Sequence, residues 1–312
     1  MSRIVVPAHA KINLCLKIAG RRVDGYHDLM TVVQSVTLAD TLSVELRPSG
    51  MTLEVDDPAI PSDANNLVWQ AAERLAAYRN AAIPGTRIRL EKRIPVGAGL
   101  GGGSSDAAAC LVALNRLWGV GLSTAELVPL AAHLGSDVPY FLQGGTALLT
   151  GRGTEVMALP DLPGRPVLLV YPGSPLTSRE VYSQVRAPLT QAVKIASMTS
   201  FGPIADSTAE AWVRSGNDLA PHAKRLCPAI GVVEECLLAA GASAVAMTGS
   251  GSAVFGVFHK AARMEGAVRS LARPGWRVMS CELLGFRDYQ QHLGLSGRGF
   301  APSWRDVGHG DH

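Results

Sequence analysis

A glycine-rich segment links a predicted strand to a predicted helix, and it reads Pro95-Val96-Gly97-Ala98-Gly99-Leu100-Gly101-Gly102-Gly103-Ser104-Ser105-Asp106. Five of the seven residues from 97 to 103 are glycine, which allows positive φ and a close approach of the backbone to a ligand. The helix behind the segment offers unpaired N–H groups and the positive end of its dipole. Together these features predict a phosphate-binding loop.

Periodic patterns on both sides of the segment support this prediction. Apolar residues recur at three- and four-residue steps over 107–118, which predicts an amphipathic helix whose first turn Ser104 or Ser105 caps. Upstream, apolar and charged residues alternate over 86–94, which predicts a strand. A flexible glycine linker is the alternative, but linkers do not normally open an amphipathic helix.

The segment differs from two common phosphate loops. The P-loop pattern G-x-x-x-x-G-K-[ST] is not present. Gly97, Gly99 and Gly102 satisfy G-x-G-x-x-G, but a dinucleotide fold also needs an acidic residue about twenty positions on. That region reads Trp118-Gly119-Val120-Gly121-Leu122 and holds no carboxylate. The Rossmann interpretation therefore fails.

Composition narrows the class of protein. The 312 residues are enough for two domains, and a net charge of +3 without a basic stripe argues against a nucleic-acid partner. Five scattered cysteines without C-x-x-C fit reduced thiols, and the histidines lack metal-ligand spacing. The start of the chain has no signal-peptide pattern, and small polar residues interrupt the uncharged stretch 237–258, which argues against a membrane span. We expect a cytoplasmic protein with no obligate protein partner.

Polar residues near the N-terminus leave two interpretations open. Residues 4–18 alternate with period two, so Lys11 and Asn13 project from one face of a strand about seven ångströms apart. That face is either a solvated edge or part of a site. The Asp-Gly turn that follows places Tyr26 and His27 side by side, where they can bind a base or pack against the next strand.

The later pattern predicts further helices and their caps. A capping box of Ser123 and Glu126 starts one helix. Asp137 stands at the start of a short helix, where an aspartate is most often a cap or a dipole partner. Ser178 and Ser207 are the predicted caps of two helices in the second half of the chain.

The order of these elements predicts two α+β domains. We place the first at 1–158 with the glycine-rich segment, and the second at 159–285. Residues 286–312 are rich in glycine and weakly patterned, which predicts a flexible tail.

With these elements in order, the sequence resembles the GHMP kinase superfamily of small-molecule kinases, up to about residue 284. Three motifs carry the resemblance: the strand with Lys11, the segment 95–105, and Thr248-Gly249-Ser250-Gly251. The most similar branch acts on a cytidyl-linked alcohol, and it shares Ala10-Lys11-Ile12-Asn13-Leu14, Arg22-Val23-Asp24-Gly25-Tyr26-His27, Gly99-Leu100-Gly101-Gly102-Gly103-Ser104-Ser105 and Gly135-Ser136-Asp137-Val138-Pro139. The resemblance implies a two-domain fold with an N-terminal domain like ribosomal protein S5 domain 2 and a ferredoxin-like C-terminal domain.

The resemblance also implies an activity. It implies that ATP, with Mg²⁺, phosphorylates the 2-hydroxyl of a CDP-linked methylerythritol in the non-mevalonate isoprenoid route. Asp137 matches the family's catalytic base and Lys11 its catalytic lysine.

The resemblance assigns further residues to the two substrates. The residues implied for ATP are Pro95, Val96, Gly97, Ala98, Gly99, Leu100, Gly101, Gly102, Gly103, Ser104, Ser105, Asn66 and Leu67. Those implied for the acceptor are Asn13, Tyr26, His27, Lys92, Thr177 and Tyr182. Ser105 is also the candidate for a contact on the Mg²⁺ side or with a phosphate. A carboxylate at Asp106 would repel phosphate unless a cation intervenes.

Two other functions remain open on the sequence alone. A homoserine or mevalonate-type kinase of the same superfamily is one, and the turn from Asp24 to His27 argues against it. A nucleotide-binding module without catalysis is the other, and the presence of both Lys11 and Asp137 argues against it.

Overall fold

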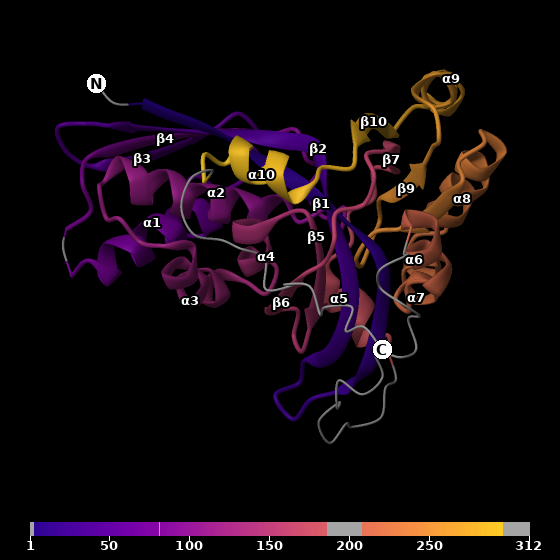
Figure 1. The fold of residues 1–312 in the computed structure, drawn as a ribbon, viewed down its shortest axis with the longest axis horizontal. Helices are drawn as coiled ribbons and strands as arrows, with labels where there is room; N and C mark the ends of the chain where they lie inside the picture. Colours follow the sequence, from indigo (N-terminus) through magenta and orange to yellow (C-terminus); the bar gives the residue numbers. More distant parts are fainter. Residues whose placement is uncertain (1–2, 81, 186–207, 296–312) are drawn as a thin grey trace, which may run out of the picture.

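The computed structural model describes residues 3–80, 82–185 and 208–295. Two α+β units lie side by side, and long strands of the first unit run down the middle of the view (Figure 1). Mixed helices and sheets in two units match the predicted fold class.

A six-stranded sheet forms the first unit. Its largest part is an antiparallel hairpin of β1 (Arg3–Arg21) and β2 (His27–Leu46). The sheet order is β3–β4–β2–β5–β6, and β1 pairs with β2. The other four strands are β3 (Met51–Val55), β4 (Thr86–Glu91), β5 (Thr146–Thr150) and β6 (Glu155–Ala158).

Helices cover one face of this sheet and supply most of its core. They are α1 (Leu67–Tyr78), α2 (Gly102–Leu117), α3 (Thr124–Leu134) and α4 (Val138–Gln143). Every residue of α2 from Ser105 to Asn115 is buried, because this helix packs against β1 and β2 as well as α1 and α4. Full burial of one large apolar side chain stabilises the fold by about 1.5–3 kcal/mol, so α2 is fixed firmly behind the glycine-rich segment.

A four-stranded antiparallel sheet of order β10–β7–β9–β8 forms the second unit. Its strands are β7 (Pro166–Tyr171), β8 (Ala244–Met247), β9 (Val254–Val257) and β10 (Arg277–Glu282). Its helices are α6 (Ala209–Ser215), α7 (Ala220–Leu226), α8 (Ala229–Ala239) and α9 (Ala261–Leu271). The uncharged stretch 237–258 is therefore the end of a helix, two strands and a loop, as the sequence predicts.

Backbone hydrogen bonds fasten the glycine-rich segment to both units. Lys11 of β1 donates its N–H to the Leu100 carbonyl at 3.0 Å, and Ala253 donates to the Ala98 carbonyl at 3.1 Å. A Cβ on Gly99 would lie 2.2 Å from the Thr248 carbonyl oxygen, so only glycine allows this approach. The loop is held rigidly between the two sheets.

The predicted caps of α2 and α5 (Ser178–Ser183) are wrong. Gly101, in the left-handed region with φ of +73°, is the N-cap of α2, and the helix has begun before it reaches Ser104 and Ser105. In α5 the cap is Thr177, whose hydroxyl accepts from Glu180 N–H in a capping box. Sequence spacing misplaces each cap because several hydroxyl residues stand near each start.

The cap of α6 also differs from the prediction. The hydroxyl of Thr208 accepts from the Ala211 N–H at 3.1 Å, whereas the predicted cap, Ser207, lies outside the described residues. The capping box of Ser123 and Glu126 at the start of α3 is confirmed.

The prediction of a flexible tail from residue 286 is wrong over residues 286–295. Helix α10 (Phe286–His292) packs on the first unit, although it follows the second in sequence. Tyr289 is 1% exposed and its hydroxyl donates to the Phe141 carbonyl at 2.7 Å. Seven residues hold too few helical turns to produce a clear apolar period. Residues 296–312 lie outside the described part of the chain.

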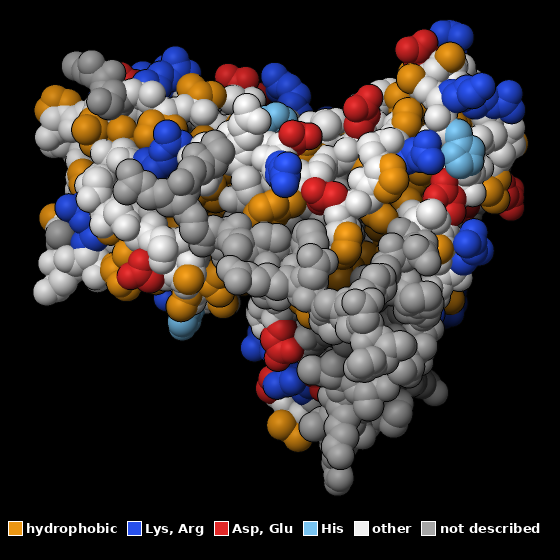
Figure 2. Space-filling view, in the orientation of Figure 1, with side chains coloured by type: hydrophobic (Ala, Val, Ile, Leu, Met, Phe, Trp, Pro, Cys, Tyr) orange, Lys and Arg blue, Asp and Glu red, His pale blue; other side chains and the backbone are white. Residues whose placement is uncertain are grey.

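Figure 2 shows acidic and basic side chains mixed over the described part of one face. Among the helices that the structure describes, none is long and apolar enough to cross a bilayer.

Candidate active site

A cleft of about 1360 Å³ lies where the two units meet. Its walls come from β1, the start of β2, the glycine-rich segment, the start of α4, α5 and the loop at Gly249. Single-ligand pockets are usually about 300–1000 Å³, so this cleft has room for two ligands side by side. Every site residue that the sequence predicts, except Ser105, lines it.

Lys11 and Asp137, which are far apart in sequence, meet in this cleft. The Lys11 ammonium Nζ lies 3.5 Å from Asp137 Oδ2, and the two side chains are 6% and 39% exposed. Lys11 Nζ also donates to Asn13 Oδ1 at 2.6 Å. Because both β1 side chains are buried, the solvated-edge interpretation is wrong.

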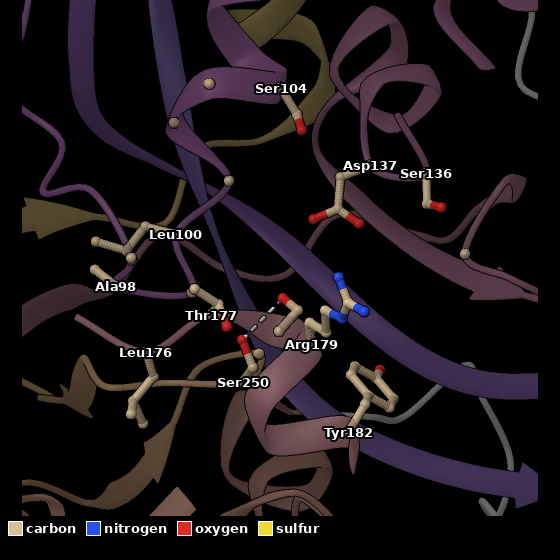
Figure 3. Close-up of a pocket in the computed structure, with 18 of the residues that line it drawn as sticks. Ala98, Leu100, Ser104, Ser136, Asp137, Leu176, Thr177, Arg179, Tyr182 and Ser250 are labelled. Carbon is tan, nitrogen blue, oxygen red and sulfur yellow. Dashed lines mark hydrogen bonds between the residues drawn. The ribbon is translucent and has the colours of Figure 1, made fainter. Parts of the chain in front are cut away.

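Asp137 occupies the N-cap position of α4, yet its side chain makes no capping hydrogen bond. Figure 3 shows the carboxylate pointing into the cleft, between Ser104 and the Arg179 side chain. The interpretation of Asp137 as a simple helix cap is therefore wrong. A half-exposed carboxylate beside a buried ammonium can accept a proton from a bound hydroxyl.

The glycine-rich segment forms the floor of the cleft beside this pair. A Cβ on Gly101 would lie 2.7 Å from the Phe141 ring and 3.2 Å from Lys11 Cε. No side chain caps the N-terminus of α2, so its first N–H groups remain free to bind an anion. Asn66 and Leu67, at the start of α1, line the same part of the cleft.

The two serines of the segment point in different directions. Ser104 faces the cleft (Figure 3). Ser105 is buried, and its hydroxyl donates to the His9 carbonyl at 2.7 Å. The predicted role of Ser105 on the Mg²⁺ side is therefore wrong, because its oxygen is turned into the core.

A second lysine, Lys92, lies beneath the segment. Its ammonium donates to Asp40 Oδ2 at 2.5 Å and to Asp106 Oδ2 at 2.6 Å. Asp40 also accepts from two backbone N–H groups, those of Arg93 and Ile94. The cation expected next to Asp106 is therefore the Lys92 ammonium. This ammonium binds both carboxylates, Asp40 and Asp106.

Asp106 carries the unusual charge state of this cluster. Burial raises the pKa of its carboxyl to about 8, which the Lys92 ammonium opposes and the nearby Asp40 carboxylate reinforces. Its Oδ1 atom is buried, and no described residue forms a hydrogen bond with it. One ammonium cannot neutralise two buried carboxylates, so the less hydrogen-bonded of the two retains a proton.

Three of the predicted acceptor residues, Tyr26, His27 and Tyr182, form an aromatic wall of the cleft, whereas Asn13 lies beside Lys11 and Lys92 lies beneath the glycine-rich segment. The His27 and Tyr182 rings lie 5.3 Å apart, and the Arg152 guanidinium lies over the Tyr26 ring at 3.7 Å from its centroid. Burial, followed by the charge of Arg21, lowers the pKa of His27, so its imidazole is neutral near pH 7. Its Nε2 atom is buried and has no hydrogen-bond partner among the described residues.

The comparisons with known proteins agree along almost the whole chain. Residues 66–145 match the GHMP kinases N terminal domain, and residues 191–275 match the GHMP kinases C terminal region. The 4-diphosphocytidyl-2-C-methyl-D-erythritol kinase of Synechococcus sp. (strain JA-3-3Ab) is 42% identical, over 87% of this chain and 90% of its own length. The chain belongs to the GHMP kinases, in the family of 4-diphosphocytidyl-2-C-methyl-D-erythritol kinases.

Other relatives of this GHMP kinase point the same way. The enzyme of the same name from Pelotomaculum thermopropionicum is 41% identical, over 93% of this chain and 99% of its own length. A crystal structure of 4-(cytidine 5'-diphospho)-2C-methyl-D-erythritol kinase superposes with a TM-score of 0.74 at 37% identity, covering 90% of this chain and all of that one. A homoserine kinase from Cytophaga hutchinsonii, at 20% identity and a TM-score of 0.66, shares the fold alone. The protein is a small-molecule kinase, and GHMP kinases use ATP as the phosphate donor.

Sequence analysis does not find several residues that line this kinase's cleft or support its walls. Arg152 and Arg179 stand in a turn and on a short helix, where no periodic pattern marks them. Thr248 belongs to a quoted motif, but its role emerges only in three dimensions, since its hydroxyl accepts from the Asn13 N–H at 3.0 Å. Asp40 lies within β2, and nothing in the sequence around it indicates its partner Lys92, 52 positions away.

Proposed function

We propose that this kinase transfers the γ-phosphoryl group of ATP to the 2-hydroxyl of 4-(cytidine 5'-diphospho)-2-C-methyl-D-erythritol, giving the 2-phosphate and ADP in the MEP pathway of isoprenoid precursors. The main support is the 3.5 Å approach of Lys11 Nζ to Asp137 Oδ2 beside the glycine-rich segment. The names of the relatives and the aromatic end of the cleft support the choice of acceptor.

Asp137 acts as the general base in this proposal. A tertiary alcohol is a poor nucleophile, and its oxygen attacks the γ-phosphorus more readily as its proton passes to a carboxylate. The new O–P bond forms while the bond from the γ-phosphorus to the bridging oxygen of ADP breaks. A positioned base contributes about 10²–10⁴ in rate.

Lys11 is the electrostatic partner of Asp137. Its ammonium favours the ionised carboxylate and offsets the charge of the phosphoryl group in transfer. Asn13 fixes the ammonium through the 2.6 Å hydrogen bond, and its amide donates in turn to Thr31 Oγ1 at 2.8 Å. Asn13 therefore acts by orienting Lys11 as well as by lining the acceptor site.

ATP binds along the glycine-rich segment in this proposal. The free N–H groups at the start of α2 suit phosphate oxygens, and Asn66 and Leu67 border the adenine. The described residues include no group of three or more His, Cys, Asp or Glu side chains that could hold a metal, and in this proposal Mg²⁺ enters the cleft with the phosphates of ATP. When bound there, it supplies charge neutralisation.

The cytosine binds at the aromatic end of the cleft. Tyr26 and Tyr182 provide ring faces for stacking, and the orphaned His27 Nε2 offers a hydrogen bond to the base edge. Thr177 lines the same wall. The sequence predicts Lys92 as a polar contact of the acceptor, but its ammonium is paired with Asp40 and Asp106. We therefore propose that Lys92 stabilises the glycine-rich segment and balances the charge beneath it.

An ADP-release assay across a panel of alcohols tests the proposal. We expect turnover with the CDP-linked methylerythritol and none above background with homoserine or mevalonate. The product should carry one new phosphate ester, which phosphorus NMR identifies. Turnover of homoserine or mevalonate without the CDP-linked alcohol would overturn the choice of acceptor. ATP binding without any phosphorylated product would instead favour a non-catalytic nucleotide-binding module.

A further inference from the structure

The cleft holds five basic side chains, and their partners differ. Lys11 faces Asp137, and Lys92 is held by two buried carboxylates. The Arg152 guanidinium lies over the Tyr26 ring. Arg21 stands at the end of the β1–β2 hairpin, in register with His27. Arg179 lines the cleft from α5 and is exposed, and it forms no ion pair with a described residue.

The backbone that carries Arg179 is fixed in place. Leu176 N–H donates to the Gly97 carbonyl at 3.1 Å, which ties the start of α5 to the phosphate-binding segment. The Ser178 hydroxyl lies 3.1 Å from that of Ser250, and Figure 3 marks this bond across the cleft wall. The neighbouring carboxylate, Glu180, accepts from Thr177 N–H and hydroxyl, so it is already engaged by the cap.

The direction of the Arg179 side chain places its charge between two functional groups. In Figure 3 the guanidinium extends from α5 to a position between the Tyr182 ring and the Asp137 carboxylate. Under the proposed function, the cytosine binds at Tyr182 and the reacting hydroxyl at Asp137. The diphosphate of such an acceptor lies between its base and its alcohol, in the same order as these three side chains.

We propose that Arg179 binds the diphosphate of the acceptor and sets the spacing between the cytosine end of the cleft and Asp137. This inference rests on the proposed function. A guanidinium presents its N–H donors in a planar fork that matches two phosphate oxygens. Because the side chain is exposed and forms no ion pair within the described part of the chain, no such pair has to be broken for it to bind a phosphate. Arg179 is therefore a specificity-determining residue for acceptors that carry a diphosphate.

Binding measurements on Arg179→Gln test this assignment without relying on turnover. Titration calorimetry with cytidine, CDP and the CDP-linked alcohol separates the base from the diphosphate. We expect the variant to bind CDP and the CDP-linked alcohol about tenfold more weakly or worse, with unchanged affinity for cytidine. In steady-state assays KM for the acceptor should rise, while kcat and KM for ATP stay close to wild type.

Two further variants separate charge and structure. Arg179→Lys keeps the charge but loses the planar fork, so it should recover only part of the affinity for CDP. Arg269→Gln removes the same charge from α9, outside the residues that line the cleft, and should leave all three affinities unchanged.

Three outcomes would overturn the inference. They are equal affinity of wild type and Arg179→Gln for CDP, an equal loss for cytidine and CDP, and a loss confined to kcat. The last would place the guanidinium at the transferred phosphate. The first two outcomes are measured by binding alone and do not depend on which alcohol is phosphorylated. Failure of the wild-type enzyme to turn over the CDP-linked alcohol would instead count against the proposed function.

Discussion

Two lysines approach the same glycine-rich segment, and their surroundings differ sharply. A Cβ on Gly101 would lie 3.2 Å from Lys11 Cε, and one on Gly102 would lie 3.4 Å from Lys92 Nζ. Each ammonium is largely buried and faces aspartate. The partner of Lys11, Asp137, is 39% exposed in the cleft, whereas the partners of Lys92, Asp40 and Asp106, are 0% and 3% exposed.

This difference in exposure separates a reactive pair from a structural one. The Asp137 carboxylate keeps a face toward the cleft and can exchange a proton with a bound hydroxyl. The carboxylates around Lys92 are enclosed, so loss of one partner leaves a buried charge without compensation. We infer that one lysine supports chemistry and the other supports the loop. Each prediction below tests that division.

The largest effect should come from Asp137→Asn. The amide cannot accept the proton, so kcat should fall about 10²- to 10⁴-fold. Because Asp137 makes no capping hydrogen bond, the melting temperature and ATP affinity should stay close to wild type. Steady-state kinetics with calorimetric ATP titration measure both. An unchanged kcat would contradict the assignment of Asp137 as the base.

Lys92→Met should produce the next largest effect, and on stability. It leaves Asp40 and Asp106 buried together without their ammonium, and breaking a buried pair in this way costs about 3–5 kcal/mol. Chemical denaturation of the variant and wild type at pH 7 measures the difference. A free energy of unfolding within about 1 kcal/mol of wild type would show that the two carboxyls tolerate the loss, and the structural role of Lys92 would be wrong.

Lys11→Met is the matched variant at the other lysine. We expect kcat to fall about a hundredfold, since the ammonium no longer stabilises the charge near Asp137. The free energy of unfolding should change by only about 1 kcal/mol, because Asp137 is left facing solvent rather than buried. The same two measurements apply. A stability loss as large as that of Lys92→Met would remove the distinction between the lysines.

The sequence predicts one half of this comparison much better than the other. The glycine run, Lys11 and Asp137 stand in short motifs, so their meeting in one cleft follows from the resemblance. The cluster around Lys92 does not follow from any motif. Asp40 stands on a strand that is far from Lys92 in the sequence, and Asp106 stands on the buried side of a helix. Local patterns cannot reveal such pairings, since charged residues at those positions are equally common on a solvated surface.

The fold shows the same limit. Most helices and strands follow from their apolar periods, and the Ser123 and Glu126 capping box follows from its spacing. Helix α10 does not, because its stability depends on Tyr289 filling a site formed by residues 145 positions earlier in the chain. Tertiary burial, rather than local propensity, decides that segment.

Asp106→Asn should have the smallest effect at neutral pH, and it tests the proton held at the Lys92 cluster. Burial raises the pKa of Asp106 to about 8 from 3.8. Between these values the native state holds a proton that the unfolded state has released, so the contribution of this group to stability falls as pH rises from about 4 to about 8. Asparagine cannot titrate and can still accept from Lys92 through its side-chain oxygen.

The variant should therefore gain stability relative to wild type as pH rises, by about 2 kcal/mol between pH 6 and 8, with little further gain above pH 9. Denaturation curves for both proteins at pH 5, 6, 7, 8 and 9 measure the difference.

Glu265→Gln on the exposed side of α9 is the control, and its difference from wild type should not vary with pH in this range. A difference for Asp106→Asn that is constant from pH 5 to 9 would mean that Asp106 is ionised throughout. The Lys92 cluster would then carry two ionised carboxylates against one ammonium. Its aspartates would be ionised at neutral pH despite their burial, and the difference in exposure between the two lysine clusters would matter less.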